Sequence, residues 1–220
     1  MKVRSPTLLV ALVVLLLAYP WLEKIASRWL LSSLTIVVLA SAAYTIGTTR
    51  RHLVGAAALG IPAATAQVLV VGEASGPRML VDALQLIFVV YVIGVLFGFV
   101  LRQGAVGVEK LSAAAALYLL LGLTWAFLYR LTNHFQGASF TLSSGTAAPT
   151  FSDLLYFSYV TLTTLGYGDI TPANDFSRSL AMLEAMSGTF FSTVLVARLV
   201  ALYGSPAIPG GDESSGSSGA

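Results

Sequence analysis

The sequence predicts an all-α membrane protein with six transmembrane helices and one short re-entrant helix that leads into a loop. Of the 220 residues, 56% are hydrophobic and 10% are charged, which is typical of a chain that lies in a bilayer. Six apolar runs occupy residues 7–22, 30–49, 53–71, 79–101, 110–131 and 176–203. A further apolar helix, residues 151–163, is too short to cross a bilayer, so it must enter and return on one side.

Composition and motifs exclude several classes of protein. The formal net charge is +2 and the basic residues are scattered, so no nucleic-acid partner is expected. The chain has no Cys, which excludes disulfides, thiolate metal sites and Cys nucleophiles. An intramembrane enzyme is disfavoured because the spans carry no His-Glu-x-x-His motif, no pair of Asp residues and no Ser with a suitable base. We expect no cofactor.

Three features of the leading runs leave alternatives open. Residues 7–22 are short for a span and follow two basic residues, so a cleaved signal peptide is the alternative to a transmembrane helix. Pro62 removes a backbone donor from the third run and predicts a kink, which is either a hinge or a packing feature. Gly94 and Gly98 either let another helix approach closely or are simply scattered through an apolar helix.

The fourth run, residues 79–101, lacks the charges of a voltage sensor. Such a helix needs several Arg or Lys at every third position. Here Arg78 and Arg102 lie at the two ends, and Asp82 is the sole charge between them. One charge that crosses the membrane field gains about 2.3 kcal/mol per 100 mV, so this helix is expected to respond weakly to voltage.

The link after the fourth run, residues 103–108, is short and contains two Gly. We therefore expect the leading helices to pack on later helices of their own chain. The fifth run, residues 110–131, precedes a polar outer loop predicted over residues 132–150. His134 is expected to be a solvated residue of this loop, with a metal or proton site as the alternative.

The short helix, residues 151–163, has a defined start. Thr150 or Ser152 can cap it, and Asp153 suits the positive end of the helix dipole. Its other end carries the negative half of the dipole, which favours a cation nearby. Four aromatic residues in or after it are predicted to form a cuff, namely Tyr156, Phe157, Tyr159 and Tyr167.

Residues 161–169 read TLTTLGYGD and predict a cation site. Gly166 and Gly168 have no Cβ, so this loop can adopt dihedrals closed to other residues and aim successive carbonyls in one direction. Such carbonyls can replace the water shell of a monovalent cation, and Thr164 adds its hydroxyl. One copy of the loop cannot surround an ion. Four identical chains around one axis are therefore predicted.

This loop resembles the selectivity filter of the potassium channel family, and the resemblance covers residues 150–203. It implies passive K⁺ conduction, with filter residues Thr164, Leu165, Gly166, Tyr167 and Gly168 and with K⁺ bound at the first four. Leu165 stands where the family usually has Val or Ile. A non-selective monovalent cation channel of the same build and a non-conducting membrane scaffold are the alternatives.

The resemblance also assigns a role to Asp169 at the outer mouth, where its charge raises the local cation concentration. In many relatives a Glu on the pore helix is the partner of this Asp. Here Val160 occupies the matching position, so Asp169 is expected to lack that partner. A Tyr or Trp donor is the alternative.

By resemblance, residues 176–203 are the inner pore helix, with Gly188 at its bending point. At helical spacing one face carries Thr189, Ser192, Val196 and Val200. The two polar residues would hydrate the ion, and the two Val residues could close the path by dewetting. Glu184 is expected to make a structural hydrogen bond behind the filter, with proton sensing as the alternative. Arg198 is expected to point away from the pore and reach the inner interface.

The predicted organisation has three parts. Residues 1–104 form a four-helix transmembrane domain, residues 105–204 form the pore domain, and residues 205–220 form a disordered tail. Six spans place both termini on one side, and a loop that enters from outside makes that side the cytoplasm of a cell-membrane protein. The distribution of Lys and Arg favours this orientation modestly. The expected partners are further copies of the chain, membrane lipids and K⁺ ions.

Overall fold

The computed structural model describes residues 5–25, 40–42, 44, 50–72, 78–101, 107–143, 145 and 148–203 of the chain. Within these residues the fold is mostly helical, as predicted. The helices are α1 (Ser5–Ile25), α3 (Arg50–Gly72), α4 (Arg78–Leu101), α5 (Val108–Gln136), α6 (Phe151–Leu162) and α7 (Asp175–Tyr203). Two short strands are present, β1 (Phe140–Leu142) and β2 (Ile170–Pro172).

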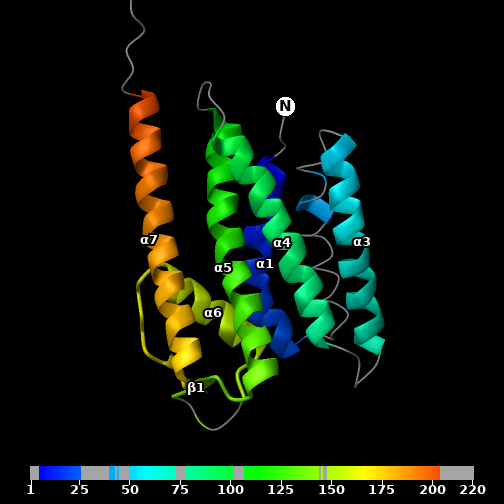
Figure 1. The fold of residues 1–220 in the computed structure, drawn as a ribbon, viewed down its shortest axis with the longest axis vertical. Coiled ribbons are helices and arrows are strands. Elements are labelled where there is room, and N and C mark those ends of the chain that lie inside the picture. Colours follow the sequence, from blue (N-terminus) through cyan, green and yellow to red (C-terminus); the bar gives the residue numbers. More distant parts are fainter. Residues whose placement is uncertain are drawn as a thin grey trace, which may run out of the picture.

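Helix α5 joins the two halves of the molecule. Figure 1 shows a row of helices with α7 at one end, α3 at the other, and α5, α1 and α4 between them. Helices α1 and α4 pack on α5 of the same chain, as expected, and α3 packs on α4. We call α1, α3 and α4 the frame helices. The short helix α6 contacts both α5 and α7 on the other side.

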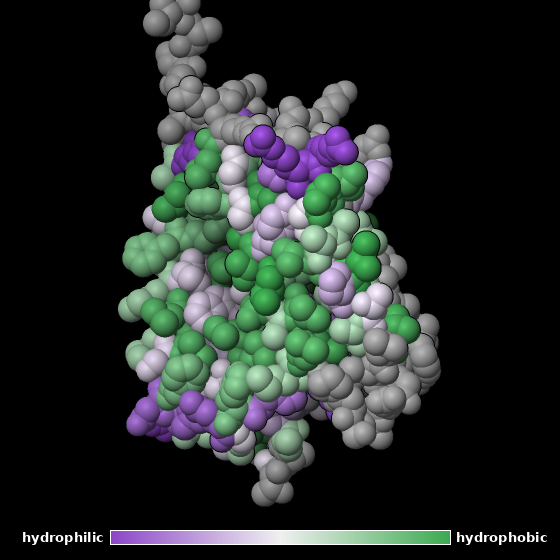
Figure 2. All heavy atoms as spheres, turned by 45° about the vertical axis from the view of Figure 1, so that its right-hand side comes forward, coloured by the Kyte–Doolittle hydropathy of each residue, from purple (hydrophilic) through white to green (hydrophobic). Residues whose placement is uncertain are grey.

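Helices α4 and α5 are long and apolar enough to cross a membrane, judged by length and composition. Their 24 and 29 residues correspond to about 36 and 44 Å of helix, against a hydrocarbon core of about 30 Å. Figure 2 shows mostly hydrophobic residues over the middle of the visible face and hydrophilic residues gathered at its ends. The count of six spans stays a prediction. The second run, residues 30–49, lies mostly outside the described residues, as does the whole of the tail, residues 205–220.

Helix α5 extends beyond its predicted end at residue 131. It ends at Gln136 because Gly137 adopts a φ of 73°, and the Gly137 amide donates to the Asn133 carbonyl at 3.1 Å. The loop predicted over residues 132–150 is therefore wrong at its start, and His134 lies in the last turn of α5. Within the same segment β1 pairs antiparallel with β2, which the sequence analysis did not predict.

The structure bears on the two features left open in the frame helices, the Pro of α3 and the Gly pair of α4. Pro62 lies inside α3, which remains one helix from Arg50 to Gly72. Gly94 and Gly98 of α4 are exposed, and a Cβ at either position would meet no atom within 4 Å. No described helix of the same chain therefore packs closely on this pair.

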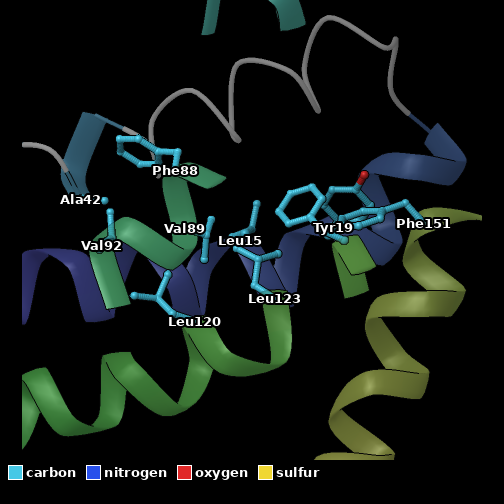
Figure 3. Close-up of a pocket in the computed structure, with 10 residues that line it drawn as sticks. Leu15, Tyr19, Ala42, Phe88, Val89, Val92, Leu120, Leu123 and Phe151 are labelled. Atoms are coloured by element: carbon cyan, nitrogen blue, oxygen red, sulfur yellow. The ribbon is translucent and has the colours of Figure 1, made fainter. Parts of the chain in front are cut away.

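The apolar core lies between α1, α4 and α5. Its largest fully buried apolar side chains include Leu8, Leu12, Phe88, Leu96, Leu117 and Leu120. A cavity of about 20 Å³ opens between Leu15, Val89 and Leu123, and Figure 3 shows Tyr19 and Phe151 at its other end. A space of this size holds about one water, and its apolar lining offers that water no partners, so it is a gap in packing and not a ligand site.

Candidate functional site

Helix α6 begins after Thr150, one of the two predicted caps. The Asp153 amide donates to the Thr150 hydroxyl at 3.3 Å, and the Thr150 amide donates to the Asp153 carboxylate at 2.8 Å. This reciprocal pair is a capping box, which satisfies two amides that the first turn of a helix otherwise leaves free. The 12 residues of α6 give about 18 Å of helix, which is too short for a span.

Side-chain hydroxyls of α6 fix it against α5. The Tyr159 hydroxyl donates to the Leu119 carbonyl at 2.5 Å, and the Ser158 hydroxyl lies 2.7 Å from the Gly122 carbonyl. A Cβ at Gly122 would lie only 2.7 Å from Cζ of Tyr159. Glycine at this position therefore allows the ring to pack directly on the α5 backbone.

Residues 163–169, which we call the Gly-x-Gly loop, follow α6 directly. Their backbone alternates: φ is 59° at Thr164, 59° at Gly166 and 79° at Gly168, while Leu165 and Tyr167 have negative φ. Alternation of this kind turns successive peptide groups to the same side, so the carbonyls share a direction. Thr164 is the one non-glycine residue with positive φ among the described residues, which is a costly conformation for a side chain with a branched Cβ.

The amides of this loop point back toward the end of α6. The Leu165 and Gly166 amides both donate to the Val160 carbonyl, at 2.9 and 3.3 Å, and the Thr164 amide donates to the Thr161 carbonyl at 2.9 Å. These donors are therefore occupied by the chain itself. In this part of the loop, the groups left for a ligand are carbonyl oxygens, together with the Thr164 hydroxyl. Oxygen groups of this kind suit a cation.

Asp169 follows the loop and has a partner. The Tyr156 hydroxyl of α6 donates to the Asp169 carboxylate at 2.8 Å, and the Ile170 amide donates to its other oxygen at 3.1 Å. The Asp169 carbonyl accepts from the Ser143 amide at 2.8 Å, which joins the loop to the segment after β1. Asp169 therefore has a Tyr as its partner in place of the Glu found in many relatives, which was the alternative left open by the sequence.

The four aromatic residues predicted to form a cuff have separate partners. Tyr156 binds Asp169 and Tyr159 binds the α5 backbone. Phe157 packs edge-on against Tyr129 and Phe140, with ring centroids 5.3 and 5.2 Å apart. Tyr167 is 66% exposed in the single chain. Within the described chain they do not form one cluster.

Helix α7 crosses the end of α6 at Gly188. A Cβ at this buried position would lie 3.0 Å from the carbonyl carbon of Leu162 and closer still to its oxygen. Glycine here is needed for close packing of α7 on the last residue of α6, and α7 continues as one helix past it. Nearby, the Trp125 indole of α5 donates to the Ser187 hydroxyl at 3.2 Å.

The residues predicted to line a cavity lie further along α7. Thr189 and Ser192 are exposed in the single chain. Val196 and Val200 belong to the same helix, but their side chains are outside the part that the structure describes. Arg198 donates to the Leu101 carbonyl at the end of α4 at 2.6 Å, so it reaches a frame helix.

Glu184 of α7 is fully buried between α5, α6 and α7. One carboxyl oxygen contacts the Tyr129 hydroxyl of α5, and the other lies 2.5 Å from the Ser158 hydroxyl of α6. The predicted hydrogen bonding of Glu184 is thus confirmed, and its partners come from two other helices. Neither Tyr129 nor Ser158 was predicted as a partner, since no local pattern in the sequence links them to Glu184.

A second buried carboxyl group lies between α4 and α5. The side chain of Asp82 is 3% exposed, forms an ion pair with Arg130 and lies 3.1 Å from Nε2 of His134. The Arg130 guanidinium also lies over the ring of Phe151, 4.1 Å from its centroid. The sequence predicted that His134 is a solvated loop residue. This prediction is wrong, because His134 is part of a polar cluster with Asp82 and Arg130. This cluster touches the first residue of α6.

Comparison with known proteins identifies the part of the chain that contains this site. Residues 113–204 match a family described as ion channel. Two-pore potassium channel 4 of Arabidopsis thaliana is 40% identical over 57 residues, which are 26% of this chain and 20% of that protein. Two pore potassium channel b of Oryza sativa subsp. japonica is 44% identical over 80 residues, which are 34% of this chain and 20% of that protein.

A third relative, two pore potassium channel c of Oryza sativa subsp. japonica, is 40% identical over 62 residues, 28% of this chain and 13% of that protein. The chain thus spans a fifth or less of the length of these curated relatives. No solved structure matches it. Residues 113–204, which contain α6, the Gly-x-Gly loop and α7, are thus similar to an ion-channel family, and the predicted resemblance to potassium channels is confirmed.

Proposed function

We propose that the chain is the subunit of a K⁺-selective channel and that the Gly-x-Gly loop is its selectivity filter. The observation that carries this proposal is the backbone of the loop, in which φ alternates in sign from Thr164 to Gly168. The amides of Leu165 and Gly166 donate to the Val160 carbonyl of α6, so the carbonyl oxygens of the loop are the candidate ligands for a cation. Carbonyls of Thr164, Leu165, Gly166 and Tyr167 would take the place of water around K⁺.

The channel is proposed to be a homotetramer. Leu165 and Tyr167 are 56% and 66% exposed in the single chain, and Phe190 of α7 is 69% exposed. Apolar side chains exposed on the loop and on the helix that follows it suit a surface that another protein covers. Four copies around one axis would cover them and close a ring of carbonyls, with Asp169 at the outer mouth.

The path below the filter would run along α7. Thr189 and Ser192 would hydrate the ion, and Val196 and Val200 would form the gate, with both termini in the cytoplasm. Conventional voltage gating is not expected, because the described part of α4 carries Arg78 at its start and only Asp82 as a charge within it. Asp82 is paired with Arg130 of α5 and is not free to move in the field.

Flux through reconstituted liposomes tests the proposal. Gly166→Asp should abolish K⁺ flux, because it puts a side chain at a positive φ and a charge into the carbonyl ring. Gly137→Asp is the matched control: Gly137 has a φ of 73° and, like Gly166, open space around it, but it ends α5 outside the loop. No flux from the wild type above that of empty liposomes would indicate a non-conducting scaffold, and equal flux from all three proteins would show that the loop is not the filter.

Selectivity and voltage dependence need separate measurements on the wild-type protein. With K⁺ on one side and Na⁺ on the other, a K⁺-selective pore shifts the reversal potential strongly toward the K⁺ equilibrium value. An unshifted potential would indicate a non-selective cation channel instead. Open probability is expected to change little with voltage. A steep change would contradict the assignment of α4 as a helix without gating charge.

A further inference from the structure

Glu184 is a buried acid whose neighbours are hydroxyl groups. Tyr129 approaches it from α5 and Ser158 approaches it from α6. Among the described residues no Lys, Arg or His forms an ion pair with it. An ionised carboxylate in such a place would be a buried charge without a counter-charge, which is strongly unfavourable.

The hydrogen bonds around Glu184 can be counted proton by proton. Three short oxygen–oxygen contacts form a chain: Tyr129 to Glu184, Glu184 to Ser158, and Ser158 to the Gly122 carbonyl. Each contact needs one proton between its two oxygens, since two bare oxygens at this distance repel each other. Tyr129 and Ser158 supply one proton each, and a carbonyl supplies none. The third proton must come from Glu184.

The direction of each bond follows from this count. The Gly122 carbonyl only accepts, so the single proton of Ser158 lies on that contact, where the oxygens are 2.7 Å apart. Ser158 therefore presents a lone pair to Oε1 of Glu184, 2.5 Å away. A carboxylate would also present a lone pair there. A carboxylic acid presents its proton.

We propose that Glu184 is a neutral carboxylic acid and the central positioning residue of a directed chain from Tyr129 through Glu184 and Ser158 to Gly122. The chain begins on α5, crosses α7 and α6, and returns to α5. It fixes α6 to α7 close to the contact between Gly188 and Leu162, directly before the Gly-x-Gly loop. Its effect on conduction rests on the proposed channel function. There, a neutral Glu184 holds the loop in place and contributes no charge to the ions.

Infrared spectroscopy tests the protonation state without requiring conduction. The purified wild-type protein at neutral pH should show the C=O stretch of a protonated carboxylic acid, and the difference spectrum against Glu184→Gln should contain that band. Glu109→Gln is the matched control, since Glu109 is exposed in the first turn of α5 and should contribute no such band. A difference spectrum with carboxylate bands only would overturn the proposal, whatever the protein conducts.

Flux measurements test the positioning role by conservative rescue. The amide of Gln can donate to Ser158 and accept from Tyr129, so Glu184→Gln should leave K⁺ flux and selectivity unchanged. Glu184→Ala leaves the buried Tyr129 hydroxyl without its acceptor and breaks the link to Ser158, so it should reduce flux per protein by about ten-fold or more. If Gln reduced flux as much as Ala, the neutral acid would be the wrong assignment.

Ser158→Ala is a second variant, which keeps the test decisive if the Ala variant of Glu184 fails to fold. It removes the acceptor of the Glu184 proton and retains the acid. The infrared band should persist and move to higher frequency, as expected of a carboxylic O–H that has lost its hydrogen bond. An unmoved band would show that Ser158 is not the acceptor and would overturn the proposed direction of the chain.

Discussion

The two buried acids of this molecule belong to regions that are built in different ways. Asp82, between a frame helix and α5, is paired with a guanidinium and lies beside an imidazole. Glu184, between α5, α6 and α7, meets only hydroxyls. A neighbouring cation offsets the cost of burying a carboxylate, while hydroxyls that need a proton favour the neutral acid. The partners of a buried acid, more than its depth, therefore decide its charge.

Glycines allow close packing in both regions, but they meet different groups. Gly188, next to the Gly-x-Gly loop, faces the backbone of α6, and a Cβ there would collide with it. On the frame side, a Cβ at Gly55 would collide with the side chain of a Tyr, while Gly94 and Gly98 have nothing near them within the described chain. The frame is attached to α5 by side-chain packing, by one charged cluster and by hydrogen bonds of the Ser5 hydroxyl.

The largest effect is expected at Gly188. Gly188→Ala places a methyl group against the Leu162 carbonyl, so α6 and α7 must separate at the base of the Gly-x-Gly loop. We expect a loss of about 3 kcal/mol of stability, the upper end of the usual cost of overpacking, and loss of K⁺ flux. Unfolding in mixed micelles and liposome flux measure the two effects. The control Gly94→Ala should change neither, and a Gly188→Ala protein that conducts like the wild type would contradict the close contact.

A smaller loss is expected at the frame acid. Asp82→Asn leaves the Arg130 guanidinium without its counter-charge, and we expect a loss of about 2–3 kcal/mol, moderated because the Arg130 side chain is 26% exposed. Unfolding by denaturant in mixed micelles measures it. Asp175→Asn is the matched control, since Asp175 is fully exposed and pairs with Arg178 at 3.5 Å on the helix surface. It should cost much less than Asp82→Asn. If the two variants lost the same free energy of unfolding, the burial of Asp82 would not contribute to the strength of its ion pair.

The smallest loss is expected at the partner of the neutral acid. Tyr129→Phe removes one donor from Glu184 and leaves one buried acceptor unpaired, for about 1–2 kcal/mol in the same unfolding measurement. Tyr91→Phe is the control, because the Tyr91 hydroxyl donates to the His52 carbonyl at 3.3 Å and touches no acid. If Tyr129→Phe cost as much as Asp82→Asn, the difference in charge between the two acids would be refuted.

Local signals in the sequence predicted much of the fold. The predicted runs 79–101 and 176–203 agree with α4 (Arg78–Leu101) and α7 (Asp175–Tyr203) within a residue, because apolar composition marks a helix at least as long as a bilayer. The start of α6 was predicted from residue types and their spacing, with Thr150 or Ser152 as the cap, and the cap is Thr150. The end of α5 was misplaced because polar residues 132–136 have no apolar pattern, and the stop is set by the conformation of Gly137.

By itself, the sequence determined the apolar helices, the glycines of the loop and the absence of positive charges within α4, since each depends on residue type and on neighbours in the chain. The tertiary structure alone decided which groups meet: Tyr129 and Ser158 at Glu184, Tyr156 at Asp169, Arg130 and His134 at Asp82. These partners are 13 to 55 residues apart in the chain. Periodicity within one helix specifies a face but not the residue that another helix brings to it. The charge of each buried acid follows from the residues that contact it.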